Sequence, residues 1–264
     1  MKVALFCVFR NETLYVNEYI DHYLKLGFDH IYLCDNSSND DVDKILKNEY
    51  NDKVTIIDIR SKETIKNFNT YYHPTLFTSL YNIFNFKYDW LCFFDLDEYL
   101  ILYKDNNIKE YLSRDIFNNV DLIHVYWKVF DDNNQLYYEN KSCVERFTHV
   151  SNKYYENFGD YANGVKSIVR SGLHLCFNNS HTPKSNNDSP LITVDNDGNI
   201  GNGFWCTYKY ATYNLASLNH YLTKSAEEYL NKNIHGQWNF YEKYFQINEY
   251  SEEKHNMLKS LLEE

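Results

Sequence analysis

The sequence predicts an α/β fold with a mostly parallel central sheet and helices on both faces of that sheet. Two observations lead to this prediction. Over the first hundred residues, apolar runs of strand length alternate with segments of helical periodicity, which is typical of parallel strands joined by crossover helices. The 264 residues include 26 Tyr, 17 Phe and 4 Trp, and 44% of the chain is hydrophobic, which is enough for a large core.

The first half of the chain contains the regular alternation. Strands are expected at 3–9, 30–34, 54–59 and 90–94, and helices at 14–26, 42–47 and 74–86. Gly27 ends the first of these helices, and Pro74 stands in the first turn of the last one, where its missing N–H does no harm.

After Leu102 the pattern changes. Strands are expected at 121–130, 165–170, 173–177 and 215–221, a helix at 225–233, and an amphipathic closing helix from residue 242. Residues 178–202 are rich in Asn, Ser, Asp, Gly and Pro, which predicts a long surface loop of the kind that often serves as a lid.

Charge and cysteine content narrow the possible functions. The net charge of −11 argues against a protein that binds duplex DNA or RNA, whose affinity rests on neutralising phosphates. No stretch approaches the roughly 20 apolar residues that span a bilayer, and the apolar start lacks a cleavage site for a signal peptide. The six cysteines are scattered without a CxxC pair, which suits reduced thiols and predicts a cytoplasmic protein.

The sharpest motif is Asp95-Leu96-Asp97-Glu98, which directly follows an apolar strand. Ligands of parallel sheets bind at the carboxyl ends of strands, and hard divalent cations take carboxylate oxygens as ligands. The motif therefore indicates a metal site that also holds phosphates. An ordinary acidic turn after a strand is the alternative.

Two further polar groups follow earlier strands. Asp35 and Asn36 could hydrogen-bond a base or a ribose at the same edge of the sheet, or they could cap the next helix. Arg10 and Glu12 follow the first strand, where an Arg could contact a phosphate or form a structural salt bridge.

Candidates in the second half are basic residues and histidines. Lys166 and Arg170 share one face of a predicted strand. His174, His181 and His220 could be metal ligands, although a lone histidine is more often structural. The chain contains no GxxxxGK[ST], GxSxG, HExxH or GxGxxG motif, which weakens the corresponding enzyme classes.

Several segments, in order along the chain, resemble glycosyltransferase family 92 and bacterial family 2-like relatives. They are RNETLYVNEYIDHYLKLGFDHIYLCDNSSND at 10–40, DWLCFFDLDEYL at 89–100, VERF at 144–147, GVKSIVR at 164–170, HTP at 181–183, and LNHYLTKSAEEYLNK at 218–232 followed by Gly236. The resemblance implies the GT-A fold, a Rossmann-like nucleotide-sugar-binding fold. It further implies one domain over 1–264, with a nucleotide-binding half at 1–102 and an acceptor-binding half with the C-terminal helices at 103–264.

The resemblance also implies an activity and a cofactor. The expected reaction moves a sugar from a nucleotide-diphosphate donor, with a UDP-sugar favoured, to a hydroxyl of a glycan or lipid-linked acceptor, with inversion. The expected cofactor is Mn²⁺ or Mg²⁺, held by the DxD carboxylates Asp95 and Asp97 with His220 or His181 completing the shell. We expect the enzyme to act in the cytoplasm, either free or at the inner face of a membrane.

The remaining site residues receive roles by the same resemblance. Arg10, Glu12, Asp35 and Asn36 would hold the nucleoside, and Asp95 would also contact the ribose. Lys166 and Arg170 would neutralise the diphosphate or orient the acceptor. Glu145 or Asp131 would be the catalytic base, with Glu145 favoured because it lies in a matching segment; Asp160 is a further candidate. The alternatives are a non-catalytic carbohydrate- or nucleotide-binding module on the same fold, and a nucleotidyltransferase.

Overall fold

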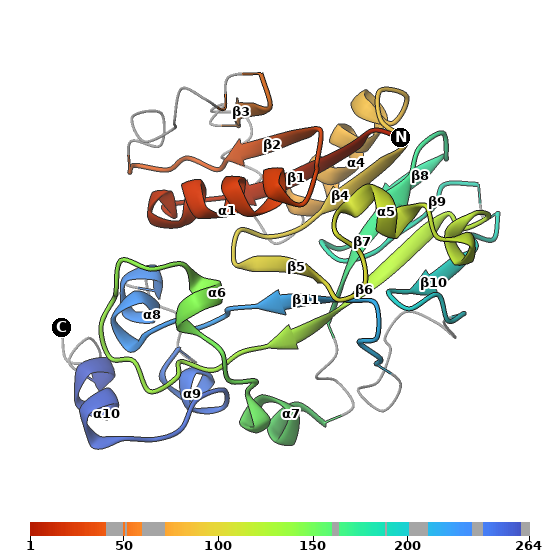
Figure 1. Ribbon diagram of the computed structural model, residues 1–264. Coiled ribbons are helices and arrows are strands. Elements are labelled where there is room, and N and C mark those ends of the chain that lie inside the picture. The colour runs from red at the N-terminus through yellow and green to blue at the C-terminus, as the bar shows by residue number, and fades with distance from the viewer. Residues whose placement is uncertain are drawn as a thin grey trace.

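The computed structural model describes most of the chain (Figure 1). The described residues are 1–40, 50, 52–59, 72–159, 164–187, 189–200, 211–233 and 240–259. The helix expected at 42–47, the candidate base Asp160 and the motif residue Gly236 lie outside the described residues.

The first strands form the parallel part of the sheet. β1 (Val3–Phe9) lies between β2 (His30–Asp35) and β4 (Trp90–Phe93), and β3 (Val54–Asp58) pairs with the outer side of β2. All three pairings are parallel. Every residue of β1 is buried, as expected of a strand covered on both faces.

Two helices cover opposite faces of these strands. The odd-numbered side chains of β1 pack in one core with α1 (Thr13–Lys25), and the even-numbered side chains pack in another with α4 (Tyr72–Phe84). This division follows from the alternation of side chains along a strand. The predicted α/β class, with helices on both faces of the sheet, is confirmed.

The second half of the chain makes the sheet mixed. Its strands are β6 (Leu122–Val129), β7 (Val165–Arg170), β10 (Thr193–Asp195) and β11 (Ala216–His220), and they are joined by β5 (Glu98–Leu102) from the end of the first half. The order along the nine-stranded sheet is β3-β2-β1-β4-β7-β6-β11-β5, with β10 beside β6. β7 runs antiparallel to both of its neighbours, and β5 runs antiparallel to β11. Strands of both halves therefore build one sheet.

The region 178–202 is not simply the long loop that its composition predicts. β8 (Leu175–Phe177) pairs with β9 (Pro183–Ser185) in a small hairpin, and β10 joins the main sheet by pairing with β6. Each of these strands has only three residues, which is too short for an alternating apolar pattern to stand out.

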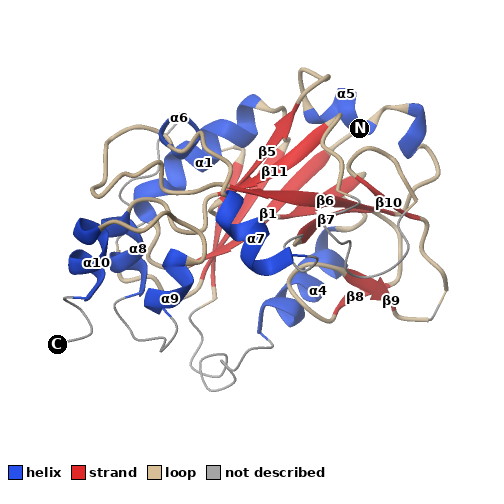
Figure 2. Cartoon of the chain, turned by 90° about the horizontal axis from the view of Figure 1, so that it is seen from below, coloured by secondary structure: helices blue, strands red, loops and turns tan. Residues whose placement is uncertain are grey.

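The C-terminal part differs from the prediction of a single closing helix. α8 (Ala226–Asn233) is followed by two separate helices, α9 (Phe240–Phe245) and α10 (Glu252–Lys259). Both views show these three helices together at one end of the molecule (Figures 1 and 2). They share a small core of their own, formed by Ala226, Tyr229, Phe240, Tyr244 and Leu258.

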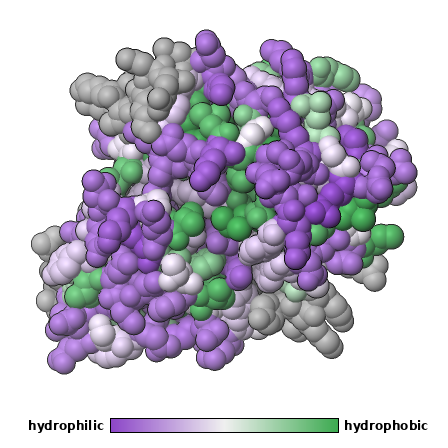
Figure 3. Space-filling view, viewed as in Figure 1, coloured by the Kyte–Doolittle hydropathy of each residue, from purple (hydrophilic) through white to green (hydrophobic). Residues whose placement is uncertain are grey.

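Short helices complete the fold: α5 (Ile108–Leu112), a 3₁₀ turn at Asp115–Phe117, α6 (Cys143–Arg146) and α7 (Asn152–Phe158). Figure 3 shows a face dominated by hydrophilic residues, with hydrophobic residues visible mainly near its middle. Among the described helices, none is both long enough and apolar enough to cross a membrane.

Candidate active site

The carboxyl ends of β1, β2 and β4 meet at one edge of the sheet. Phe9 is paired with Asp35 in the register of β1 and β2, and the Asn36 N–H donates to the Phe9 carbonyl at 2.8 Å. Chain segments that are far apart in sequence therefore enclose one cavity of about 300 Å³. Its polar lining comprises Arg10, Glu12, Asn36, His73, Asp95, Asp97 and Lys232.

The loop between β1 and α1 is fastened to the loop after β2. Asn11 has a left-handed backbone with φ of 54°, and its N–H donates to Ser38 Oγ at 3.0 Å. The Asn11 side chain in turn accepts the Asn39 N–H at 2.9 Å. Asp35 is buried and accepts the Ser38 N–H at 2.8 Å, so its carboxylate shapes this turn.

The turn from β4 to β5 positions the two carboxylates of the DxD motif. The Asp95 N–H donates to Glu98 Oε2 at 2.8 Å, and the Glu98 N–H donates back to the Asp95 carbonyl at 3.1 Å. The Tyr221 N–H donates to the Asp97 carbonyl at 2.9 Å, which ties the turn to the residue that follows β11. The backbone of the motif is therefore held at both ends.

Lys166 neutralises Asp95. Its ammonium is completely buried and lies 2.7 Å from Asp95 Oδ2 and 4.0 Å from Glu98 Oε1. Burial alone would raise the pKa of Asp95, but the ammonium of Lys166 more than offsets this and the pKa is lowered. Glu98 is also completely buried, and burial raises its pKa well above the usual range despite Lys166.

Asp97 is paired with two groups of the second half. Lys232 Nζ lies 2.9 Å from Asp97 Oδ2 and 2.9 Å from Glu12 Oε1, and His220 Nε2 lies 3.4 Å from Asp97 Oδ1. Burial opposes the ionised form of Asp97, yet Lys232 and His220 together hold the pKa of this carboxyl well below its ordinary value. Asp97 is thus ionised at neutral pH.

The structure brings most of the candidate residues together, with three exceptions among the basic residues and histidines: Arg170, the exposed His174 and His181 do not line the cavity. Arg170 pairs with Trp90 in the register of β4 and β7, at the opposite end of β4, and its guanidinium stacks 4.2 Å from the indole ring. His181 is not among the residues that line the cavity; its Nδ1 lies 3.0 Å from the Val165 carbonyl, and burial lowers its pKa to about 4.

The two candidates for the catalytic base lie away from the described cavity lining. Glu145 is exposed and forms a capping box with Ser142 at the start of α6. Asp131 Oδ1 accepts the Asn133 N–H at 2.8 Å, and burial raises the pKa of this carboxyl. Neither residue lines the cavity that contains the DxD carboxylates.

Three residues of the site were not identified from the sequence. His73 precedes Pro74 in α4, Glu98 supports Asp95, and Lys232 bridges Asp97 and Glu12. Lys232 stands on α8, inside the segment LNHYLTKSAEEYLNK. Its position twelve residues after His220 was visible in the sequence, but nothing in the spacing says that a helix returns this lysine to the sheet edge.

The donor set fits a hard divalent cation that shares its shell with a substrate. Asp95 Oδ1 is buried without a hydrogen-bond partner, and Asp97 Oδ1 faces His220 Nε2. In the part of the chain that the structure describes, no three His, Cys, Asp or Glu side chains cluster as a complete metal site. Mg²⁺ is commonly held by one or two carboxylates, with phosphate oxygens and waters as its other ligands.

A second cavity of about 640 Å³ adjoins the first. The two cavities share Arg10, Glu12 and Lys232, so the Glu12–Lys232 ion pair stands at the boundary between them. Half of its lining residues belong to α1 and α8, and Tyr138 adds a second aromatic ring to that of Tyr15.

Comparisons with known proteins identify the family of the chain. The galactosyltransferase LgtC, solved with donor and acceptor sugar analogs, is a similar structure with 10% sequence identity and a TM-score of 0.29. That match covers 63% of this chain and 57% of the LgtC chain, so it spans little more than half of that enzyme. No curated protein matches the sequence significantly. The profile of glycosyltransferase family 92 matches residues 5–261, and the chain therefore belongs to this family of sugar-transferring enzymes.

Proposed function

We propose that this glycosyltransferase moves a sugar from a nucleoside-diphosphate donor, with a UDP-sugar favoured, to a hydroxyl of a glycan or lipid-linked acceptor. We further propose Mn²⁺ or Mg²⁺ as cofactor and inversion at the anomeric carbon. The observation that supports the proposal best is the pair Asp95 and Asp97, which line one cavity at the carboxyl ends of parallel strands.

Cations surround the proposed donor site. Lys166 and Lys232 contact the two carboxylates, and Arg10 is exposed at the cavity and forms no hydrogen bond or ion pair with any described residue. A diphosphate carries several negative charges, and an arginine fork matches phosphate geometry well. We assign Arg10 to the diphosphate, and Asn36 to the nucleoside because its Oδ1 is buried without a partner.

The proposed cation would be held by Asp95 and Asp97, with His220 beside them. Once bound, such an ion stabilises the negative charge that develops on the departing diphosphate. The protein's own groups keep this site anionic, because the lowered pKa values of Asp95 and Asp97 leave both carboxyls ionised at neutral pH. If Asp97 bound the cation, Lys232 would still be paired with Glu12.

The transfer itself breaks the bond from the anomeric carbon to the phosphate oxygen and forms a bond to the acceptor oxygen. The anomeric carbon becomes oxocarbenium-like, as in glycoside hydrolysis. In an inverting reaction a carboxylate takes the proton of the acceptor hydroxyl. Glu145 and Asp131 stay the proposed candidates for this base, and Glu145→Gln and Asp131→Asn test them through kcat at saturating substrates. The true base shows a loss of 100-fold or more, at the low end of the usual range of about 10²–10⁴.

Two broader assignments complete the proposal. Residues 1–102 would bind the nucleotide and 103–264 the acceptor, although Lys166, His220 and Lys232 of the second half reach the carboxylates of the first. We also propose a cytoplasmic setting, because Cys7, Cys34, Cys92, Cys143 and Cys176 are all free thiols.

The test is release of free nucleoside diphosphate from a panel of UDP-, GDP- and CDP-hexoses, with and without Mn²⁺. We expect release from one nucleotide class, lost on chelation and in Asp97→Asn. Hydrolysis of donor in the absence of acceptor is sufficient for the readout. Binding of a donor without any release, over the whole panel, would favour the non-catalytic binding module instead.

A further inference from the structure

The second cavity contains a buried cation that forms no hydrogen bond or ion pair with a described residue. Lys224 is only 3% exposed, yet among the described residues its ammonium forms neither a hydrogen bond nor an ion pair. It lies 4.3 Å above the ring of Tyr15, which also lines the cavity. Its backbone is left-handed, with φ of 54°, a conformation that costs energy for a residue with a long side chain.

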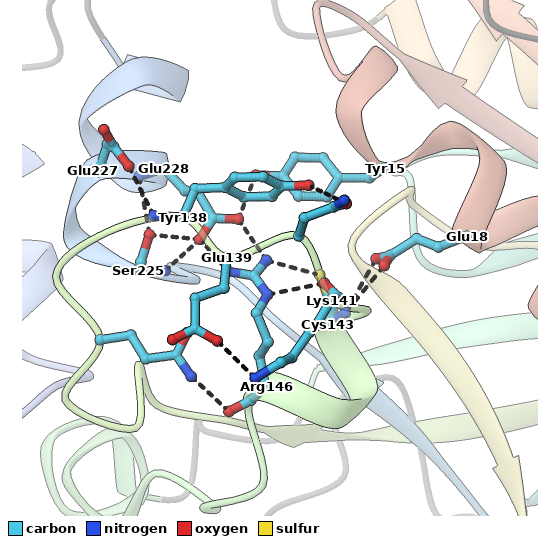
Figure 4. A network of polar contacts seen from close by, with 12 residues as sticks. Tyr15, Glu18, Tyr138, Glu139, Lys141, Cys143, Arg146, Ser225, Glu227 and Glu228 are labelled. Carbon is cyan, nitrogen blue, oxygen red and sulfur yellow. Dashed lines mark hydrogen bonds and ion pairs between the residues drawn. The ribbon is translucent and has the colours of Figure 1, made fainter.

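The acidic residues of this cavity are already engaged. Glu228 accepts hydrogen bonds from Nη1 and Nη2 of Arg146, each at 2.7 Å, and from the hydroxyl of Tyr15 at 2.7 Å (Figure 4). Glu12 is paired with Lys232. Glu227 Oε2 accepts the Tyr138 N–H at 2.7 Å.

Two of the three cations that line this cavity form no ion pair with a described residue. Arg10 and Lys224 both line it, and neither forms a hydrogen bond or an ion pair with a described residue. A buried ammonium is strongly destabilising unless it is paired, so a negative charge from a ligand is the expected complement. The lining contains three carboxylates, Glu12, Glu227 and Glu228, yet among the described residues none of them forms an ion pair with Lys224.

The aromatic wall suits a sugar ring. Tyr15 is oriented by its hydrogen bond to Glu228, and the guanidinium of Arg146 lies 5.1 Å from the ring centre of Tyr138. Both rings line the cavity and add apolar surface to it, while the Tyr15 hydroxyl is engaged by Glu228. The cavity shares Arg10, Glu12 and Lys232 with the DxD cavity, so a molecule bound here lies next to the proposed donor.

We propose that the second cavity binds the acceptor, and that the acceptor carries an anionic group, a phosphoryl or a carboxylate, that pairs with Lys224. This inference rests on the proposed function, because a sugar acceptor is meaningful only beside a sugar donor. It names a substrate class for the cavity: a phosphorylated or acidic sugar, or a sugar linked through a phosphate to a lipid.

The test measures binding, so that it does not depend on turnover. Glucose 6-phosphate, glucuronate and glucose are titrated into the wild-type protein in the presence of UDP and Mn²⁺, and the dissociation constants are compared. We expect at least one anionic probe to bind ten times more tightly than glucose. The tighter of the two identifies a phosphoryl or a carboxylate as the preferred group.

Two variants connect the preference to Lys224. Lys224→Met keeps the apolar stem and removes the charge, and is expected to abolish the preference, whereas Lys224→Arg is expected to retain it. Asp97→Asn, which tests the donor site, is expected to leave the preference for an anionic probe intact. If the wild type shows this preference but no turnover, the proposed function is wrong and the anion site is still supported.

Three results would overturn the inference. In the first, glucose binds to the wild type as tightly as both anionic probes. In the second, the preference survives Lys224→Met. In the third, Lys224→Met weakens UDP binding and leaves binding of the anionic probes unchanged, which would assign Lys224 to the donor.

Discussion

The charge of Asp97 is central at the scale of single residues. Lys232 and His220 hold this carboxyl in its ionised form, although it is 9% exposed and burial opposes ionisation. The same two groups fix its direction, since each faces a different carboxylate oxygen. An anionic, oriented and largely dehydrated carboxylate is an expensive arrangement that a bound cation would stabilise.

Asp97→Asn keeps the shape of this side chain and removes its charge. We predict a fall in kcat of at least ~100-fold, because loss of the cation removes several kcal/mol of stabilisation of the leaving diphosphate. The measurement is kcat with circular dichroism as the check on folding. Asp105→Asn is the matched control: Asp105 is paired with Arg114 and lies outside both cavities, and its loss should leave kcat unchanged.

His124 predicts a pH dependence of stability. It is buried on β6, and burial lowers its pKa from 6.5 to about 4. Between these values the unfolded chain binds a proton that the folded protein does not, so stability falls as the pH is lowered from 6.5 to 4. One unmatched proton corresponds to at most ~1.4 kcal/mol per pH unit.

Denaturant unfolding at several pH values tests this effect. His124→Gln should flatten the slope of stability between pH 6.5 and 4, whereas His174→Gln, at an exposed position, should leave it unchanged. An unaltered slope in His124→Gln would show that His124 is not held neutral in the folded protein.

At the scale of elements, a buried ion pair joins α6 to α8. Arg146 and Glu228 are almost completely buried and make two hydrogen bonds of 2.7 Å (Figure 4). Arg146→Met leaves Glu228 as a buried charge with only hydroxyl and amide donors, and we predict a loss of about 3–5 kcal/mol of unfolding free energy.

The neighbouring pair Lys141–Glu139 is a suitable control for Arg146→Met. It is also formed beside α6, but both side chains are more than half exposed. Lys141→Met should therefore cost less than ~1 kcal/mol. Equal losses in the two variants would mean that the buried pair does not anchor α8, and with it Lys232.

Gly164, just before β7, packs tightly against Trp127 of β6. A Cβ atom on Gly164 would lie 2.0 Å from the ring of Trp127, which also contacts the imidazole of His220 at 4.4 Å between ring centres. Gly164→Ala must displace the indole, and we predict a loss of about 1–3 kcal/mol together with a reduced kcat.

Gly172→Asn is the control: it also replaces a glycine, but at a position without a steric clash. Gly172 has a left-handed φ of 78° and open space around it, and Asn tolerates this conformation better than most residues. Its stability and kcat should stay close to those of the wild type. Normal kcat in Gly164→Ala would contradict a link from Trp127 to His220.

At the scale of the whole molecule, the sequence predicts which strand ends form the site, but it does not predict that α8 packs against them. Fully apolar strands such as VALFCVF announce a buried parallel sheet, and parallel strands bring Asp35, Arg10 and Asp97 to one edge. The position of α8 at that edge depends on tertiary packing. The hydrophobic periodicity of a single segment does not show where that segment packs.

The two basic residues of β7 show the same limit. Positions 166 and 170 share a strand face, as the alternation predicts, but four residues of strand span about 13 Å. Lys166 therefore reaches Asp95 at the carboxyl edge, while Arg170 lies at the other end of β4 beside Trp90. The alternation of side chains along a strand predicts which face of the sheet a residue lies on. It does not predict which end of the strand lies at the active site.

The most direct test of the central claim is thermal stability with UDP, GDP and CDP, each with and without Mn²⁺, in the wild type and in Asp97→Asn. A ligand at a hundredfold excess over its Kd stabilises the native state by about 2.7 kcal/mol. We predict that one nucleotide, UDP in the favoured case, raises the melting temperature only when Mn²⁺ is present, and that the shift disappears in Asp97→Asn. No shift with any nucleotide, or a shift that is indifferent both to Mn²⁺ and to Asp97, would contradict the account.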